Sequence, residues 1–192
     1  MLYTEDIKGG EPMIKTIKKK FDMVEMLYYY WQVTSERGKV GEAYIIDVAN
    51  RLEMKYIYDE EFNEEEARKV LSCISNSEPL NSKSRKARKF WNNNMWMLED
   101  LEYTDMMITP VKTLNLDSLI DKINTRIENP KYEEVEVLFI PSTDEEYLIK
   151  ENKLIINFFR VKPDLYEEGK VTIGELPFID FIEEKLIELL GE

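Results

Sequence analysis

The chain has 192 residues and contains no histidine, one cysteine and seven glycines. These counts exclude His-based catalytic triads, His metal sites, intramolecular disulfides and Cys-rich metal centres. None of the glycines stands in a phosphate-binding loop motif. With 39 acidic and 26 basic residues the net charge is −13, and a hydrophobic content of 43% is sufficient for a folded core. Any acid–base catalysis would therefore depend on carboxylates tuned by burial.

The cellular location follows from apolar runs and cysteine content. A membrane-spanning helix needs ~18 consecutive apolar residues. The best run, residues 23–33, is interrupted by Glu25 and Gln32. A single thiol fits a reducing compartment. The sequence therefore predicts a cytoplasmic protein without a membrane segment.

The first third of the chain is predicted to be helical. Residues 1–12, with Gly9, Gly10 and Pro12, are predicted to be a flexible lead-in. From Ile14 onward, apolar residues recur at steps of three and four, which predicts one helix that ends where Gly38 takes a left-handed conformation. This apolar face contains Ile14, Ile17, Phe21, Val24, Tyr28 and Trp31. A second helix fits residues 41–54.

Capping signals place the next two helices. Asn63 is a typical N-cap residue, and Glu66 stands three positions later as in a capping box. After a turn that contains Pro79, a fourth helix fits residues 83–101. We therefore predict a helical domain over residues 13–110.

The pattern changes after Pro110. Asp117 is predicted to cap a helix that ends near Ile127, and residues 135–140 read as a strand. Residues 147–149 and 154–159 read as a hairpin in which Asn152 takes a positive φ. Residues 171–173 form a further strand, and a periodic helix follows Pro177.

The predicted fold class is therefore α+β. About four N-terminal helices precede a helix, a small antiparallel β meander and a C-terminal helix. Residues 111–192 form the second predicted domain or subdomain.

A basic cluster is the sharpest local feature of this acidic chain. It consists of Lys83, Arg85, Lys86, Arg88 and Lys89, with no acidic residue among them. Such a cluster can contact phosphates, and residues 64–101 would then form a helix-turn-helix-like segment. The structural alternative is a solvated first helical turn paired with acidic neighbours, including Glu64, Glu65 and Glu66. The net charge and the missing turn glycine favour this alternative.

The next segment combines three consecutive asparagines with two tryptophans. Asn92, Asn93 and Asn94 lie between Trp91 and Trp96, and apolar residues surround this predicted helix. These five residues are candidates for a ligand pocket, because amides give direction and indoles give contact area. The structural alternative, which we favour, is a buried polar network that fixes the core.

A resemblance adds to this picture. The stretch from Phe90 to Met107, FWNNNMWMLEDLEYTDMM, resembles a segment of small bacterial proteins of uncharacterised function. The resemblance implies a bacterial origin, and it assigns no activity and no functional residue.

Three functional hypotheses follow. The first, which we favour, is a protein-interaction or regulatory module, since an acidic surface can recruit a basic protein partner. The second is a nucleic-acid-binding regulator that uses residues 64–101. The third, which we favour less, is a His-free enzyme that uses carboxylates. The sequence predicts no catalytic residue, no metal site and no cofactor.

Overall fold

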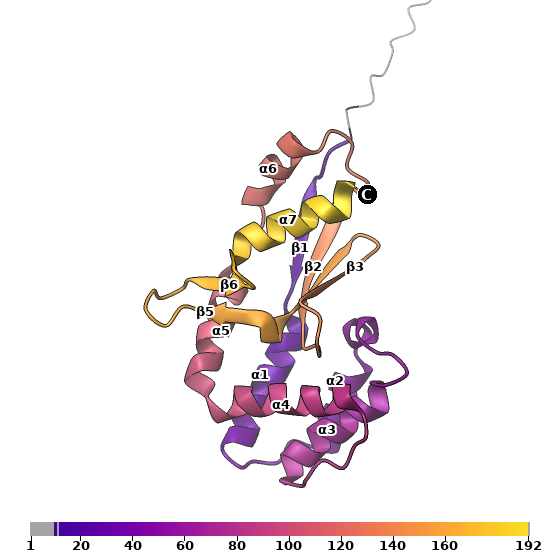
Figure 1. Ribbon diagram of the computed structural model, residues 1–192, viewed down its shortest axis with the longest axis vertical. Coiled ribbons are helices and arrows are strands. Elements are labelled where there is room, and N and C mark those ends of the chain that lie inside the picture. Colours follow the sequence, from indigo (N-terminus) through magenta and orange to yellow (C-terminus); the bar gives the residue numbers. More distant parts are fainter. Residues whose placement is uncertain (1–9, 11, 192) are drawn as a thin grey trace, which may run out of the picture.

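The computed structural model describes residue 10 and residues 12–191 of the chain (Figure 1). The fold is α+β, as predicted. Over the described residues it contains two β-sheets, and a C-terminal helix follows the smaller sheet. The predicted lead-in falls almost entirely outside the described residues.

The larger sheet has the strand order β1–β2–β4–β3. Its strands are β1 (Thr16–Lys20), β2 (Glu134–Ile140), β4 (Lys153–Asn157) and β3 (Tyr147–Lys150). β2 runs parallel to both β1 and β4, whereas β3 pairs with β4 in an antiparallel hairpin. The smaller sheet, formed by β5 (Val161–Pro163), β6 (Val171–Ile173) and β7 (Leu176–Pro177), is an antiparallel meander. A small antiparallel meander is therefore present, and the predicted strand 171–173 belongs to it. The other predicted strands lie in the larger sheet, which is mixed.

The first predicted helix begins too early. Residues 16–20 form β1 instead, with Ile17 paired to Val135 and Lys19 to Val137. The spacing of Ile14, Ile17 and Phe21 fits a helix, but a short strand with one buried residue leaves hardly any alternation to read. β1 therefore joins a sheet whose other strands lie beyond residue 133, which a local pattern does not reveal.

Helices make up much of the described part of the chain. They are α1 (Asp22–Ser35), α2 (Glu42–Asn50), α3 (Glu64–Asn76), α4 (Arg85–Glu99), α5 (Leu101–Thr113), α6 (Ser118–Arg126) and α7 (Phe178–Gly191), with 3₁₀ turns η1 (Leu52–Tyr56) and η2 (Phe158–Arg160). The boundary predicted after residue 110 falls inside α5. The buried hydrophobic residues of both predicted domains form one cluster.

Local capping signals are partly confirmed. Asn63 caps α3 by accepting a hydrogen bond from the Glu66 N–H at 3.1 Å, as the capping box predicts. The fourth helix, predicted over residues 83–101, is present as α4. The next helix, α5, was not predicted, and Asp100 caps it by accepting from the N–H of Tyr103.

Two predictions of positive φ were one residue off. Arg37, with φ 59°, ends α1 in place of Gly38. In the β3–β4 turn the positive φ belongs to Glu151, not Asn152. The Asn152 side chain instead donates to the Glu134 carbonyl at 3.1 Å, which ties the turn to β2.

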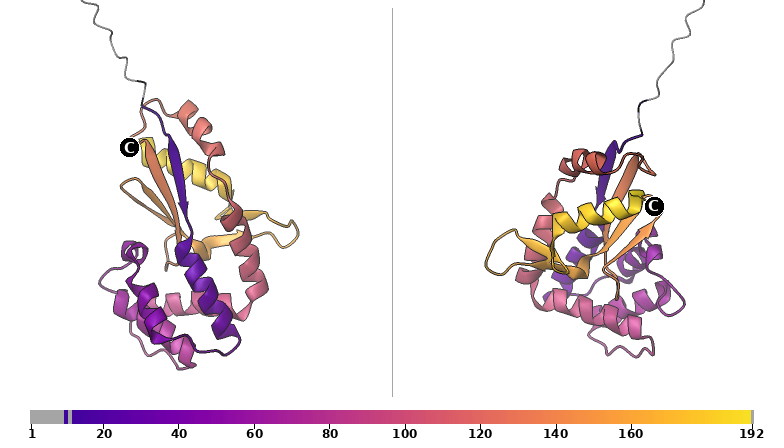
Figure 2. Two further views of the ribbon diagram at one scale, coloured as in Figure 1. Left: turned by 180° about the vertical axis from the view of Figure 1, so that it is seen from behind. Right: turned by 45° about the horizontal axis from the view of Figure 1, so that its top comes forward.

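The helices lie on one face of the larger sheet and beyond one of its ends. α7 crosses a face of this sheet, and α1–α4 gather beyond the carboxyl ends of the parallel strands (Figures 1 and 2). Within the described ranges, no helix combines the length and apolarity that crossing a bilayer requires.

Lys19 connects β1 to the end of α5. Its ammonium donates to the carbonyl oxygens of Val111 at 2.9 Å, Lys112 at 2.6 Å and Leu114 at 3.0 Å. These are among the carbonyls that the C-terminus of an α-helix leaves without i+4 partners. A cation at this end also interacts favourably with the helix dipole. Burial lowers the pKa of Lys19, and the nearby Glu25 partly offsets that effect.

We expect Lys19→Met to lower the free energy of unfolding by about 1–2 kcal/mol, because it removes the ammonium donor from these three carbonyls. Lys18→Met is the matched control, since Lys18 forms an exposed ion pair with Glu134 that contributes little. Urea unfolding of both variants measures the difference, and equal losses would refute the capping role of Lys19.

Candidate binding cleft

Carboxylates outside α4 compensate the unfavourable charge at its start. Five cations within seven residues crowd a helix N-terminus, where the helix dipole disfavours them. The Glu61 carboxylate accepts from the backbone N–H groups of Arg85 at 2.8 Å and Lys86 at 3.2 Å. Ser84 caps the same helix by accepting from the Ala87 N–H at 2.9 Å. The helix N-terminus is therefore already occupied by protein groups.

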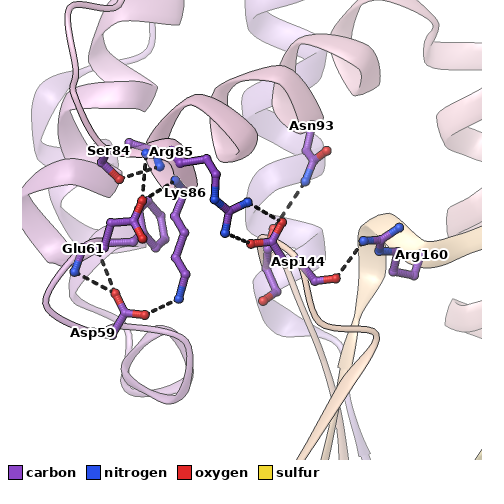
Figure 3. A network of polar contacts seen from close by, with 11 residues as sticks. Asp59, Glu61, Ser84, Arg85, Lys86, Asn93, Asp144 and Arg160 are labelled. Carbon is purple, nitrogen blue, oxygen red and sulfur yellow. Dashed lines mark hydrogen bonds and ion pairs between the residues drawn. The ribbon is translucent and has the colours of Figure 1, made fainter.

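Two of the five predicted contact cations are held in ion pairs (Figure 3). Both terminal nitrogens of the Arg85 guanidinium donate hydrogen bonds to the Asp144 carboxylate, at 3.0 and 2.6 Å. Lys86 pairs with Asp59. These cations lower the pKa of each carboxyl, chiefly through the hydrogen bonds that they donate. The partners are therefore Asp59 and Asp144, not the predicted Glu64, Glu65 and Glu66.

The middle of α4 is fixed by a buried amide. Asn94 is fully buried, and its side-chain oxygen accepts from the Trp31 indole N–H of α1 at 2.9 Å. Its amide nitrogen donates to the Phe90 carbonyl at 2.8 Å. Asn94 is thus a core residue. Trp91 is half-buried, and its indole nitrogen has no hydrogen-bond partner among the described residues.

The remaining pocket candidates line an open cleft between α4 and the η2–β5 segment. The cleft encloses about 510 Å³, which lies within the range of small-molecule sites. Its lining residues are Lys89, Asn92, Asn93, Trp96 and Met97 of α4, with Phe159, Arg160 and Lys162 opposite. The cleft therefore brings one member of the predicted basic cluster together with three of the predicted pocket residues.

Three cations border this cleft without a carboxylate partner. Across the described part of the chain, no carboxylate oxygen lies within 4.0 Å of a charged nitrogen of Lys89, Arg160 or Lys162. Arg160 donates to the backbone carbonyl of Asp144 at 2.7 Å, while the Asp144 carboxylate faces Arg85. No acidic residue lines the cleft. The cleft is therefore locally cationic in a protein of net charge −13.

Asn157 positions the wall opposite α4. It is 2% exposed, and its side-chain oxygen accepts from the N–H groups of Ser142 at 3.2 Å and Phe159 at 3.1 Å. Its amide nitrogen donates to the Glu145 carbonyl at 2.9 Å. One buried side chain thus ties the β2–β3 loop to η2, the turn that contains Arg160.

Sequence reasoning missed Arg160 and Lys162. The signal was present, because the two cations flank Val161, which is buried in β5. Arg160 ends η2 and Lys162 lies in β5, and both side chains line the cleft. No element is predicted for residues 160–162, and no local pattern shows that α4, which is distant in sequence, faces them.

The structure also describes the predicted helix-turn-helix-like segment and Arg88, another predicted phosphate contact. α3 and α4 are joined by residues 77–84, which is longer than the three- or four-residue turn of a DNA-binding helix-turn-helix. Arg88 donates to the backbone carbonyls of Ser82 and Lys83 at 3.0 and 3.2 Å.

Within the described ranges, no group of three or more Cys, Asp and Glu side chains is placed to hold a metal ion.

Comparisons with protein families, with curated proteins and with solved structures found no match for this chain.

We expect Asn94→Leu to destabilise the protein by about 2–3 kcal/mol, because it leaves the buried Trp31 indole N–H without an acceptor. Asn92→Leu, two residues earlier on the exposed side of the helix, should change the free energy of unfolding by less than about 0.5 kcal/mol. Chemical denaturation of the two variants makes the comparison. A small effect of Asn94→Leu would show that this amide does not fix α4.

Proposed function

We propose that the protein is a regulatory or interaction module that captures an anionic, phosphate-bearing ligand in the cleft between α4 and β5. The observation behind this proposal is the set of three cations, Lys89, Arg160 and Lys162, that border the cleft without carboxylate partners. The chain has 39 acidic residues, and they pair with many of its other cations. A concave surface that keeps its positive charge attracts anions, even when the whole molecule is acidic.

The enzyme hypothesis receives less support from the titratable groups. Four carboxyl groups among the described residues have a clearly shifted pKa, and each is shifted downward: Asp59, Asp144, Asp164 and Glu188. A carboxyl that acts as a general acid near neutral pH needs a raised pKa instead. The cleft itself is lined by no carboxylate. We therefore propose binding without catalysis at this site.

We expect a short inorganic polyphosphate to bind the cleft with an affinity that falls as salt rises. Three phosphate contacts give a slope of roughly −2 in log affinity against log salt, by analogy with single-stranded polyanions. Arg160→Gln or Lys162→Gln should each weaken binding about tenfold at low salt, since a hydrogen bond to a charged group contributes about 1.5 kcal/mol. Isothermal titration calorimetry at two salt concentrations measures both effects.

Lys150→Gln is the matched control, because it removes the same charge at the turn end of the β3–β4 hairpin, away from η2. Absence of binding at low salt would eliminate the proposal. So would equal affinities of the Arg160→Gln and Lys150→Gln variants.

A second candidate function, binding of a basic protein partner, is favoured by the β5–β6 loop. Leu165 and Tyr166 at this loop are 67% and 96% exposed. In the sequence they lie between Asp164 and Glu168, which line a groove of about 290 Å³ between α5 and the loop. Its lining includes Met106, Pro110 and Pro163 with the carboxylates Glu102, Asp105, Asp164 and Glu168. Exposed apolar side chains beside a groove with four carboxylates fit a partner segment that is both apolar and basic.

Affinity purification from an extract of the native cell tests this second candidate. We expect the unaltered chain and the Lys162→Gln variant to retain a stoichiometric basic partner, which a Leu165→Ser/Tyr166→Ser variant should lose. Retention of the same partner by all three chains, or an acidic partner, would contradict a basic-partner surface at this loop.

A further inference from the structure

We propose that the anionic ligand of the cleft is a single-stranded nucleic acid, one base of which stacks on Trp96. This inference rests on the proposed function, since it identifies the class of ligand that the cationic cleft takes. It depends on a different observation, which is that α4 presents the Asn92 amide and the exposed Trp96 indole beside these cations.

The exposure of Trp96 is the first argument. Its side chain is 73% exposed, whereas Trp31 is fully buried and Trp91 is half-buried. The exposed indole borders the same cleft as Arg160 and Lys162. An aromatic plane beside cations is the arrangement by which proteins hold single strands, with bases stacked on the ring and phosphates on the cations.

The order of residues along α4 is the second argument. Lys89, Asn92 and Trp96 are spaced by three and four residues, so they lie in a row on one helical face about 10 Å long. The row presents a cation, then an amide, then an aromatic ring. Within the described part of the chain, the Asn92 side chain has no hydrogen-bond partner, so its donors and acceptor face solvent beside the cleft. An amide of this kind can pair with the edge of an unpaired base.

The shape and charge of the molecule favour a single strand over a duplex. Bases inside a duplex are stacked on one another and cannot stack on an indole without unpairing. The cations that a protruding reading helix would use at its start, Arg85 and Lys86, are held by Asp144 and Asp59. The molecule as a whole carries a net charge of −13, which repels a wide, highly charged duplex more than a narrow strand that enters a local cationic cleft.

Fluorescence anisotropy with the full chain tests the inference. The probes are end-labelled oligothymidylate and oligouridylate of about 12 nucleotides, within the site size of single-strand-binding modules. A labelled abasic strand of the same length has the same phosphates but no bases, and a labelled duplex of that length has stacked bases. Unlabelled thymidine and uridine monophosphates serve as competitors, which distinguishes a strand from a free nucleotide.

We expect both oligonucleotides to bind about 5- to 150-fold more tightly than the abasic strand, which is the range that one stacked base supplies. Trp96→Ala should reduce oligonucleotide affinity to the abasic level, while Trp96→Phe should keep most of the difference. Because Trp96 is exposed, both variants should fold as the unaltered chain does, and thermal unfolding checks this.

Other outcomes separate the two proposals. Equal binding of the abasic strand and no effect of Trp96→Ala would overturn base stacking but leave anion capture intact. Tighter binding of the duplex, or full displacement by stoichiometric mononucleotide, would overturn the single-strand assignment. Failure of every phosphate-bearing probe, including the abasic strand, would overturn both proposals together.

Discussion

The buried hydrogen bond between Trp31 and Asn94 determines where α4 lies, and the cleft depends on that position. The bond joins α4 to α1, which continues directly from the edge strand β1 of the larger sheet. At its start, α4 is held by the Arg85–Asp144 ion pair, which reaches the β2–β3 loop. The sheet and the helices are therefore connected on both sides of the cleft by polar contacts between residues far apart in the chain.

The opposite wall has a comparable anchor. Asn157 ends β4 and holds both the β2–β3 loop and η2, so that Arg160 and Lys162 face α4. The cleft thus lies beyond the carboxyl end of a parallel strand, a place where open sheets with parallel strands often bind ligands. The two walls come from segments about 60 residues apart in sequence, which meet only in the folded chain. The wall positions are consequences of the fold as a whole.

Local signals predicted the elements better than their partners. The Asn63 cap, the β3–β4 hairpin and the C-terminal helix are confirmed because each depends on residues close in sequence. β1 was missed because its pairing partner lies more than 100 residues away. The candidate residues on α4 show the same contrast between local signals and long-range contacts. The sequence singled out their chemistry, but only the fold separates buried Asn94 from Asn92 and Trp96 and places Arg160 opposite them.

The most direct test of cleft binding is a nuclear magnetic resonance titration of the ¹⁵N-labelled chain with a single-stranded oligonucleotide. The chain has three tryptophans, so its indole N–H groups give three distinguishable signals. We predict a large shift for the exposed Trp96 signal and for the Asn92 side-chain amide, with almost none for Trp31, whose N–H is bonded to Asn94. Unchanged Trp96 and Asn92 signals at saturation, with the largest shifts on α3 or the β5–β6 loop, would contradict it.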